Sequence, residues 1–204
     1  MRLPQGSRVA DIGSSDLFYR TRAQPHVFEH IYNPLLQAGV NILSCDSKKE
    51  IGIDCVIDVC NPGRSLYQDT QQRFELVLCA NMLEHVVDRR VVMKNLISIT
   101  REGGCLLLTV PHTYFYHEDP IDTMYRPRPE ELLSLVAEQA ECEVVLEAIL
   151  PITQKHYYLM PVYPRKLLHN LPFFAYRQAW RWLLKPFRWK VTCLLVRIVR
   201  RHDN

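Results

Sequence analysis

Residues 74–86 read FELVLCANMLEHV, and within this stretch an apolar run changes abruptly into polar residues. Residues 74–79 are rich in strand-forming side chains, which indicates a buried β-strand. Asn81, Glu84 and His85 follow the strand directly. Ligands of open α/β sheets bind outside the carboxyl ends of the strands, so these residues are candidates for a binding site. In a simpler interpretation, Glu84 and His85 cap the helix that follows.

Four more apolar runs of this kind lie along the chain, at residues 8–12, 41–45, 55–59 and 105–110. Helical patterns separate the runs. The pattern at 26–38 ends at Gly39, the one at 87–100 ends before Gly103, and the one at 129–141 begins at Pro129, which suits a first helical turn. This alternation predicts an α/β fold with a mostly parallel central sheet and helices on both faces.

Composition predicts one domain with an unusual C-terminal part. A chain of 204 residues with 48% hydrophobic content is long enough for one sizeable core and short for two. Residues 164–204 hold ten Lys/Arg and one acid, a balance of +9, whereas 15 Lys/Arg and 21 acids give residues 1–163 a balance of −6. We therefore expect an α/β domain over residues 1–163 and a basic extension over residues 164–204.

Seven cysteines occur singly, without a C-x-x-C pair or a Cys/His cluster at zinc spacing. Most lie inside apolar runs, so we expect reduced thiols in the core, no disulfide framework and no metal site. Residues 1–10 contain no apolar signal segment, and no stretch approaches the ~20 apolar residues of a membrane-spanning helix. These observations predict a cytoplasmic protein.

A glycine and three carboxylates stand at the ends of the first three runs. Gly13 lets the chain turn tightly after the first run, and Asp46 after the second run can accept hydrogen bonds from two ribose hydroxyls. Asp11 and Asp58 hold similar positions at the first and third runs. The full G-x-G-x-x-G pattern is absent, which disfavours NAD or FAD and favours a nucleoside ligand without phosphates. Capping of turns and helices is the alternative role for these carboxylates.

From residue 9 to about residue 136 the chain resembles the type 11 group of class I S-adenosylmethionine-dependent methyltransferases, especially those with glycan or cell-envelope substrates. Residues 74–86, Asp88 and the stretch REGGCLLLTVP at 101–111 carry the resemblance. Residues 112–133, HTYFYHEDPIDTMYRPRPEELL, resemble the acceptor-facing region of one branch. The resemblance implies a Rossmann-like class I methyltransferase fold and S-adenosylmethionine as the cofactor.

The same resemblance assigns roles to individual residues. It places Asp11 and Gly13 on the methionine and ribose side of the cofactor, Asp46 on the ribose and Asp58 near the adenine. Residues 81–85 close the pocket. The complete set of implied cofactor-binding residues is Asp11, Gly13, Ser14, Asp46, Asp58, Asn81, Met82 and His85.

Two positions depart from the pattern of that group. The glycine-rich loop is reduced to Gly-Ser-Ser-Asp at residues 13–16, and Glu75 stands where aspartate is common. Serine adds Cβ atoms near the expected cofactor position, which would lower the affinity or reshape the loop. A non-catalytic partner protein that keeps the fold with a degenerate cofactor loop is therefore the alternative to an enzyme.

Methyl transfer requires alignment of the acceptor with the methyl group, sometimes with a base that takes the acceptor proton. His112 and His117 are the predicted bases, because imidazole titrates near neutral pH. The predicted acceptor-binding residues are Asp119, Asp122, Tyr125 and Arg126. In the alternative interpretation this region is a polar lid whose side chains bind only the backbone.

Residues 173–185 and 187–198 each place apolar and aromatic side chains at three- and four-residue spacing beside a stripe of Lys and Arg. This pattern predicts two basic amphipathic helices, which suit an anionic membrane surface or a partner protein, or pack on the domain itself. Nucleic acid is not an expected partner, because no recognised binding motif is present.

Taken together, the sequence predicts a methyltransferase that modifies an oxygen of a saccharide or of a lipid-linked envelope intermediate. The basic extension would place it on the inner face of a membrane. A small metabolite or a protein as the acceptor remains an open alternative.

Overall fold

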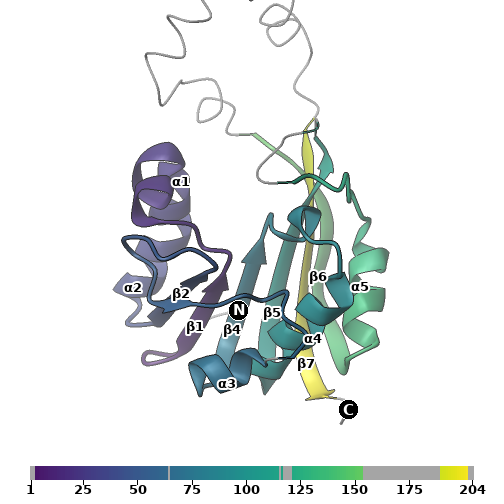
Figure 1. Ribbon diagram of the computed structural model, residues 1–204, viewed down its shortest axis with the longest axis horizontal. Helices are drawn as coiled ribbons and strands as arrows, with labels where there is room; N and C mark the ends of the chain where they lie inside the picture. The colour runs from purple at the N-terminus through teal and green to yellow at the C-terminus, as the bar shows by residue number, and fades with distance from the viewer. Residues whose placement is uncertain (1–2, 64, 115, 117–120, 154–188, 202–204) are drawn as a thin grey trace, which may run out of the picture.

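A computed structural model of the chain describes residues 3–63, 65–114, 116, 121–153 and 189–201 (Figure 1). Within this part, the strands form a seven-stranded sheet with the order β3-β2-β1-β4-β5-β7-β6. Neighbouring strands are parallel, except that β7 runs antiparallel to both of its neighbours. The strands are β1 (Arg8–Ile12), β2 (Asn41–Asp46), β3 (Cys55–Val56), β4 (Phe74–Ala80), β5 (Thr100–Thr113), β6 (Ala140–Pro151) and β7 (Lys190–Arg201).

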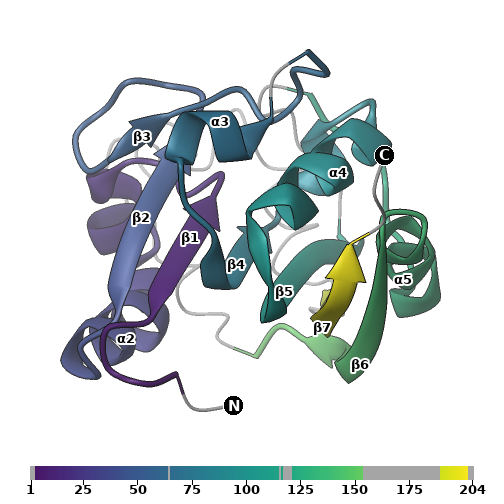
Figure 2. The same ribbon diagram turned by 90° about the horizontal axis from the view of Figure 1, so that it is seen from below.

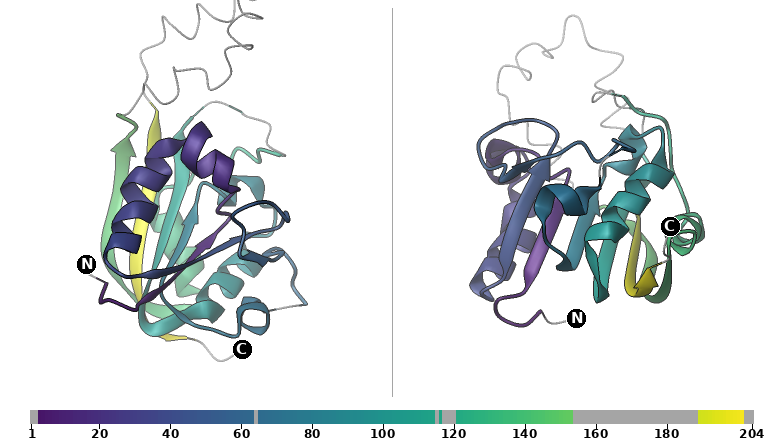
Figure 3. Two further views of the ribbon diagram at one scale, coloured as in Figure 1. Left: turned by 90° about the vertical axis from the view of Figure 1, so that its left-hand side faces the viewer. Right: turned by 60° about the horizontal axis from the view of Figure 1, so that its bottom comes forward.

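Helices cover both faces of the sheet (Figure 2), as the sequence predicts. The larger apolar core lies on one face, beneath α3 (Leu66–Thr70), α4 (Arg89–Ile99) and α5 (Pro129–Ala137). A helical stretch covers the other face at β1 and β2 (Figure 3). It consists of η1 (Tyr19–Ala23), α1 (Pro25–Val27), η2 (Phe28–Tyr32) and α2 (Asn33–Gln37). The positions of Gly39 after α2 and of Pro129 at the start of α5 agree with the predicted helix ends.

The start of α4 shows which residue caps this helix, a role that the sequence left open for Glu84 and His85. Asp88 precedes the helix, and its Oδ1 accepts hydrogen bonds from the backbone N–H groups of Arg90 and Val91, each at 3.2 Å. A carboxylate in this position satisfies amides that have no partner within the helix. Asp88 is therefore the cap, and Glu84 and His85 do not have that role.

The predicted amphipathic helix at residues 187–198 is wrong, because Lys190–Arg201 form strand β7. Leu194, Val196 and Ile198 are fully buried in the larger core, whereas Arg197 before Ile198 and Val199 after it are exposed. Apolar residues in this segment recur both two apart and three or four apart, so the sequence fits either period. The open edges of β5 and β6 select the strand, because β7 satisfies the backbone groups of both.

Residues 190–201 are therefore part of the sheet and do not belong to a helical extension. The other predicted amphipathic helix, at residues 173–185, lies outside the described residues. The predicted helix at 129–141 ends earlier, at Ala137, and the unpredicted strand β6 follows it along the edge of the sheet. Most residues of β6 are exposed, and glutamates interrupt its apolar residues. The sequence therefore contains little indication of this strand.

All seven cysteines are free thiols. Four of them are buried, as expected for core residues: Cys45, Cys79, Cys105 and Cys193. Glu75 lies at the amino end of β4, on the edge of the sheet opposite the strand carboxyl ends, where it pairs with Arg101 at 2.8 Å. Among the described helices, none has the length and the apolar character needed to cross a membrane.

Candidate functional site

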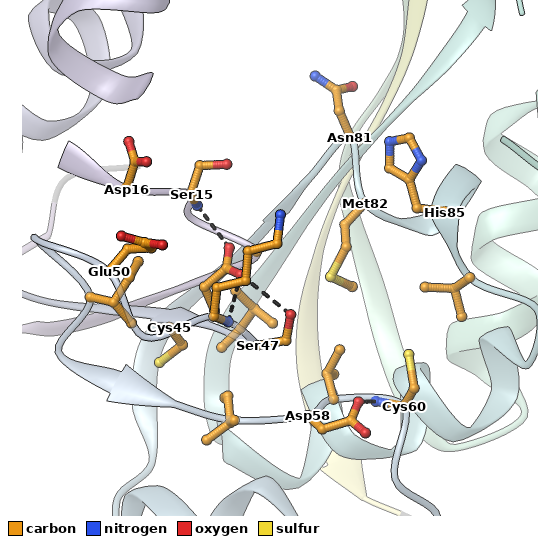
Figure 4. Close-up of a pocket in the computed structure, with 18 of the residues that line it drawn as sticks. Ser15, Asp16, Cys45, Ser47, Glu50, Asp58, Cys60, Asn81, Met82 and His85 are labelled. Carbon is orange, nitrogen blue, oxygen red and sulfur yellow. Dashed lines mark hydrogen bonds between the residues drawn. The ribbon is translucent and has the colours of Figure 1, made fainter. Parts of the chain in front are cut away.

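A cavity of about 450 Å³ lies at the carboxyl ends of β1, β2 and β4, where the fold predicts a ligand site (Figure 4). Its walls come from the loops that follow the first four strands. The lining residues are Ile12, Gly13, Ser15, Asp16, Tyr19, Cys45, Asp46, Ser47, Lys48, Glu50, Ile53, Ile57, Asp58, Val59, Cys60, Asn81, Met82, His85 and Val86. The size falls within the range of small-molecule sites.

The turn after β1 requires a glycine. Gly13 has φ +77°, and a Cβ atom there would lie 3.1 Å from Sδ of Met82. The Met82 side chain points into the cavity from the loop after β4 (Figure 4). The Cys45 carbonyl accepts the N–H groups of Gly13 at 2.9 Å and Ser14 at 3.1 Å, which fixes the turn against the end of β2. Close approach of backbone to a neighbouring group is a common reason for glycine at such positions.

Ser15 has a backbone conformation that glycine would normally occupy. Its φ is +56°, in the left-handed region that costs most residues about 1–2 kcal/mol. Its N–H donates to Oδ2 of Asp46 at 3.0 Å, while Oδ1 of Asp46 accepts the Lys48 N–H at 3.3 Å (Figure 4). Each carboxylate oxygen can accept two hydrogen bonds, so Asp46 retains capacity for a ligand hydroxyl.

Two predicted cofactor residues, Asp11 and Ser14, lie behind the cavity and do not line it. Asp11 shares a face of β1 with Val9, so its side chain points toward the helical stretch on that face. Its Oδ2 accepts the Tyr32 hydroxyl at 2.6 Å, and burial raises the pKa of its carboxyl group. The Ser14 hydroxyl donates to the Ser15 carbonyl at 3.3 Å.

The other six predicted cofactor residues do line the cavity: Gly13, Asp46, Asp58, Asn81, Met82 and His85. Asp58 accepts the Cys60 N–H at 2.9 Å and is otherwise exposed. Sequence reasoning missed Tyr19, Lys48 and Glu50, which come from η1 and from the loop after β2. None of the three directly follows a predicted strand: Tyr19 lies on η1, and Lys48 and Glu50 lie farther along the loop after β2.

Glu84 is a buried carboxyl group in the wall next to the cavity. Its side chain is 1% exposed, and its Oε2 has no hydrogen-bond partner. Burial raises its pKa to about 7. The Nδ1 atom of His85 lies 2.5 Å from the Ile121 carbonyl, which only accepts, so Nδ1 carries a proton. Nε2 of His85 faces Oε1 of Glu84 at 3.7 Å, within range of an ion pair when the imidazole is protonated.

The loop after β5 packs on this wall and contains the predicted acceptor residues. Asp122 and Arg126 pair with each other at 2.6 Å, and the Asp122 carboxylate, which has no exposed surface, also accepts the Met124 N–H at 2.8 Å. The structure thus brings these two residues into a buried ion pair within the loop. The Tyr125 ring lies beneath the guanidinium of Arg89, 3.9 Å from the ring centroid.

The two predicted bases have different outcomes. His112 ends up on β5 outside the cavity lining, with Nδ1 3.2 Å from the Pro127 carbonyl, so Nε2 is the basic atom of the neutral ring. His117 and the predicted acceptor residue Asp119 lie outside the described residues. Among the residues that the structure describes, no group of three or more His, Cys, Asp or Glu side chains is arranged to hold a metal ion.

Comparison with known proteins gives matches by structure only. No family model matches the sequence, and no curated protein matches it. Phosphoethanolamine N-methyltransferase 2 of Haemonchus contortus, solved with S-adenosylhomocysteine, is similar at 12% identity and a TM-score of 0.52 over 97% of this chain. This chain spans half, 50%, of the length of that enzyme.

Two further structures have the same arrangement. Coclaurine N-methyltransferase, bound to N-methylheliamine and S-adenosylhomocysteine, matches at 13% identity and a TM-score of 0.57, over 96% of this chain and 66% of its own. The [4+2]-cyclase SpnF matches at 14% identity and a TM-score of 0.57, over 96% of this chain and 76% of its own. The chain therefore has the Rossmann-like fold of class I methyltransferases.

Proposed function

We propose that the protein is an S-adenosylmethionine-dependent methyltransferase. The observation that carries the proposal is the cavity at the carboxyl ends of β1, β2 and β4, where Asp46 stands beside a glycine turn. The neighbours solved with S-adenosylhomocysteine support this cofactor for a chain of the same fold. Identity to them is low, so the reaction has to be argued from the site itself.

The cavity residues fit this cofactor better than a phosphate-bearing one. Asp16, Asp46, Glu50 and Asp58 make the lining acidic, and among the described residues that line the cavity Lys48 is the only lysine or arginine. Carboxylates suit an ammonium, a sulfonium and ribose hydroxyls, and they would repel a pyrophosphate. Gly13 leaves open the approach to the turn that a Cβ atom would fill. Asp46 would hold the ribose, and Asp58 would lie toward the base.

The chemistry that the protein must add is modest. S-adenosylmethionine supplies a methyl group already activated by a sulfonium, so this chain has to align the acceptor and remove its proton. His85 is the best-placed imidazole, because it lines the cavity and Glu84 lies behind it. A proton taken up on Nε2 of His85 would be stabilised by the Glu84 carboxylate. His112 remains the base predicted from the sequence.

We further infer that the acceptor is a saccharide or a lipid-linked intermediate presented at a membrane. Large apolar side chains flank the cavity on both sides. Leu17, Phe18 and Ile51 are 41%, 52% and 80% exposed on the β1–β2 side, and Val87 and Met124 are 77% and 50% exposed on the β4–β5 side. Exposed apolar groups around a cavity suit contact with a lipid surface, and residues 164–188 contain six Lys/Arg and no acid, a composition that anionic lipids attract.

Binding to vesicles tests this part of the proposal. The full-length chain is needed, because truncation at residue 163 would remove strand β7 from the sheet. The intact protein should sediment with vesicles that contain phosphatidylglycerol more than with neutral phosphatidylcholine vesicles. Ile51→Asp and Val87→Asp together should reduce sedimentation, whereas Tyr67→Asp, an exposed residue on α3, should not. Equal sedimentation of all three proteins would contradict a membrane-facing rim.

A non-catalytic role is the competing proposal. Its support is the loop itself, because Ser15 adopts φ +56° and uses Asp46 as a partner, so the ribose carboxylate is already engaged by the protein. Cofactor binding separates the two proposals.

Calorimetric titration with S-adenosylmethionine and S-adenosylhomocysteine is the deciding experiment. Micromolar binding that Asp46→Ala abolishes would support the enzyme, and Glu130→Gln, an exposed acid on α5 far along the chain from the cavity, is the matched control. If the cofactor binds, a second assay should detect transfer of labelled methyl groups from S-adenosylmethionine to an extract of lipid-linked saccharides. The absence of binding by folded wild-type protein would favour the non-catalytic role.

A further inference from the structure

Arg20 is buried beneath the cavity wall, on η1, with only 3% of its surface exposed. Its guanidinium donates to three acceptors from three parts of the chain. Nη1 reaches the Ser15 carbonyl at 3.1 Å and the Tyr32 hydroxyl at 3.1 Å, and Nη2 reaches the Gly52 carbonyl at 2.6 Å. The group also lies 4.8 Å from the centroid of the Tyr32 ring.

Two of these acceptors belong to the loops that form one wall of the cavity. Ser15 lies in the loop after β1, and Gly52 lies in the loop after β2 between the lining residues Glu50 and Ile53. Gly52 has φ +87°, and a Cβ atom there would lie 2.8 Å from Nη2 of Arg20. Glycine at position 52 therefore makes room for the guanidinium. A single side chain ties the two loops to each other.

Arg20 binds Ser15, the residue of the loop after β1 that has a strained backbone conformation. Ser15 has φ +56°, and both of its peptide groups are held from outside the loop. Its N–H donates to Asp46, and its carbonyl accepts from Arg20. A non-glycine residue stays in the left-handed region only when its surroundings determine the conformation. Arg20 and Asp46 provide those surroundings for Ser15.

The charge of Arg20 is balanced without involving the loops. The Tyr32 hydroxyl accepts from Arg20 and donates to Asp11, so a buried carboxylate lies one hydroxyl away from the guanidinium. A buried charge needs such a partner. Arg20 thus has two separable connections, one to Asp11 through Tyr32 and one to the backbone of the two loops. Each can be removed by a different substitution.

We propose that Arg20 is a positioning residue for the cofactor cavity: its guanidinium holds the loops after β1 and β2 in one arrangement and stabilises Ser15 in the positive-φ conformation that a glycine would adopt without strain. This rests on the proposed binding of S-adenosylmethionine. Amide hydrogen exchange reports on the two loops directly, so the role of Arg20 in their arrangement can be measured independently of cofactor binding.

Arg20→Lys is the principal test. Lysine keeps the positive charge near Asp11, but one ammonium cannot reproduce the planar fork that reaches both loop carbonyls. Affinity for S-adenosylhomocysteine should fall about tenfold, the effect of losing one charged hydrogen bond. Amide hydrogen exchange at residues 13–16 and 50–53 should accelerate in the protein without ligand.

Tyr32→Phe is the matched control. It removes the hydroxyl between Arg20 and Asp11 and leaves both carbonyl contacts of Arg20 in place. The melting temperature should fall, while the affinity for S-adenosylhomocysteine and the exchange of the two loops should stay near wild type. Equal loss of affinity in Tyr32→Phe and Arg20→Lys would overturn the proposal, because both effects would then follow from lower stability.

Ser15→Gly supplies a second discriminating variant. Glycine adopts positive φ without strain, so Arg20→Lys should cost clearly less affinity in the Ser15→Gly background than in the wild type. An undiminished cost would contradict a role through Ser15. If the wild-type protein binds no S-adenosylhomocysteine, the proposed function fails, and loop exchange in Arg20→Lys alone decides the role of Arg20: faster exchange supports it, and unchanged exchange overturns it.

Discussion

Replacement of Glu84 by glutamine should make the protein more stable at neutral and alkaline pH. The Glu84 side chain is 1% exposed, its Oε2 has no partner, and burial raises its pKa from 4.5 to about 7. The groups around it are His85, Arg126 and Asp122. Glutamine has nearly the same shape and carries no charge. It therefore mimics the protonated acid and removes the titration.

The sign of the effect follows from proton linkage. Between pH 4.5 and 7 the folded protein holds a proton on Glu84 that the unfolded chain has released. The unfolded state binds fewer protons there, so the free energy of unfolding falls as the pH rises, by about 1.4 kcal/mol for each pH unit. The loss reaches about 3 kcal/mol at pH 7 and stays constant above it. Protonation at acidic pH restores this stability.

Urea unfolding followed by circular dichroism, at pH values from 4 to 8, measures the effect. The stability of Glu84→Gln relative to wild type should be lowest at pH 4 and should rise by about 3 kcal/mol by pH 8. Glu130→Gln, which changes an exposed acid on α5, is the matched control for the substitution itself. A difference between Glu84→Gln and wild type that is constant over this range would refute the reasoning, because Glu84 would then titrate as in the unfolded chain.

Three further substitutions test the site and the fold. Gly13→Ala should lower the stability by about 1–2 kcal/mol in thermal unfolding and should weaken cofactor binding. The φ of Gly13 is +77°, and the new Cβ would press on Met82. Unchanged binding would contradict the close approach of these two residues. Arg126→Met removes the ion-pair partner of the buried Asp122 carboxylate and should cost about 3–5 kcal/mol in urea unfolding at pH 7. A surface ion pair would not produce a loss of that size. Leu194→Ala should lower the free energy of unfolding by about 2–5 kcal/mol, because Leu194 is fully buried. Val199→Ala on the same strand should lower it far less, because Val199 is 42% exposed. Equal losses would argue against strand β7.

Local patterns along the sequence determined much of the sheet and part of the site. The predicted run at residues 8–12 coincides with β1, and the runs at 41–45 and 74–79 each fall one residue short of β2 and β4. Central parallel strands are buried on both faces, so their sequences are continuous apolar runs. Residues that follow such runs meet at one edge of the sheet. This is why Gly13, Asp46, Asp58 and Asn81 could be assigned to one cavity from the sequence.

Tertiary structure alone decided the features that depend on a distant partner. Residues 190–201 fit both a helical and a strand period, and the open edges of β5 and β6 select the strand. Asp11 follows the strand alternation away from the cavity, to Tyr32. Arg20 has no motif around it, yet it joins two loops more than 30 residues apart along the chain. The periodicity of apolar residues indicates which residues are buried. The hydrogen-bond partner of a buried polar side chain depends on how distant segments pack together, and no local pattern in the sequence indicates that.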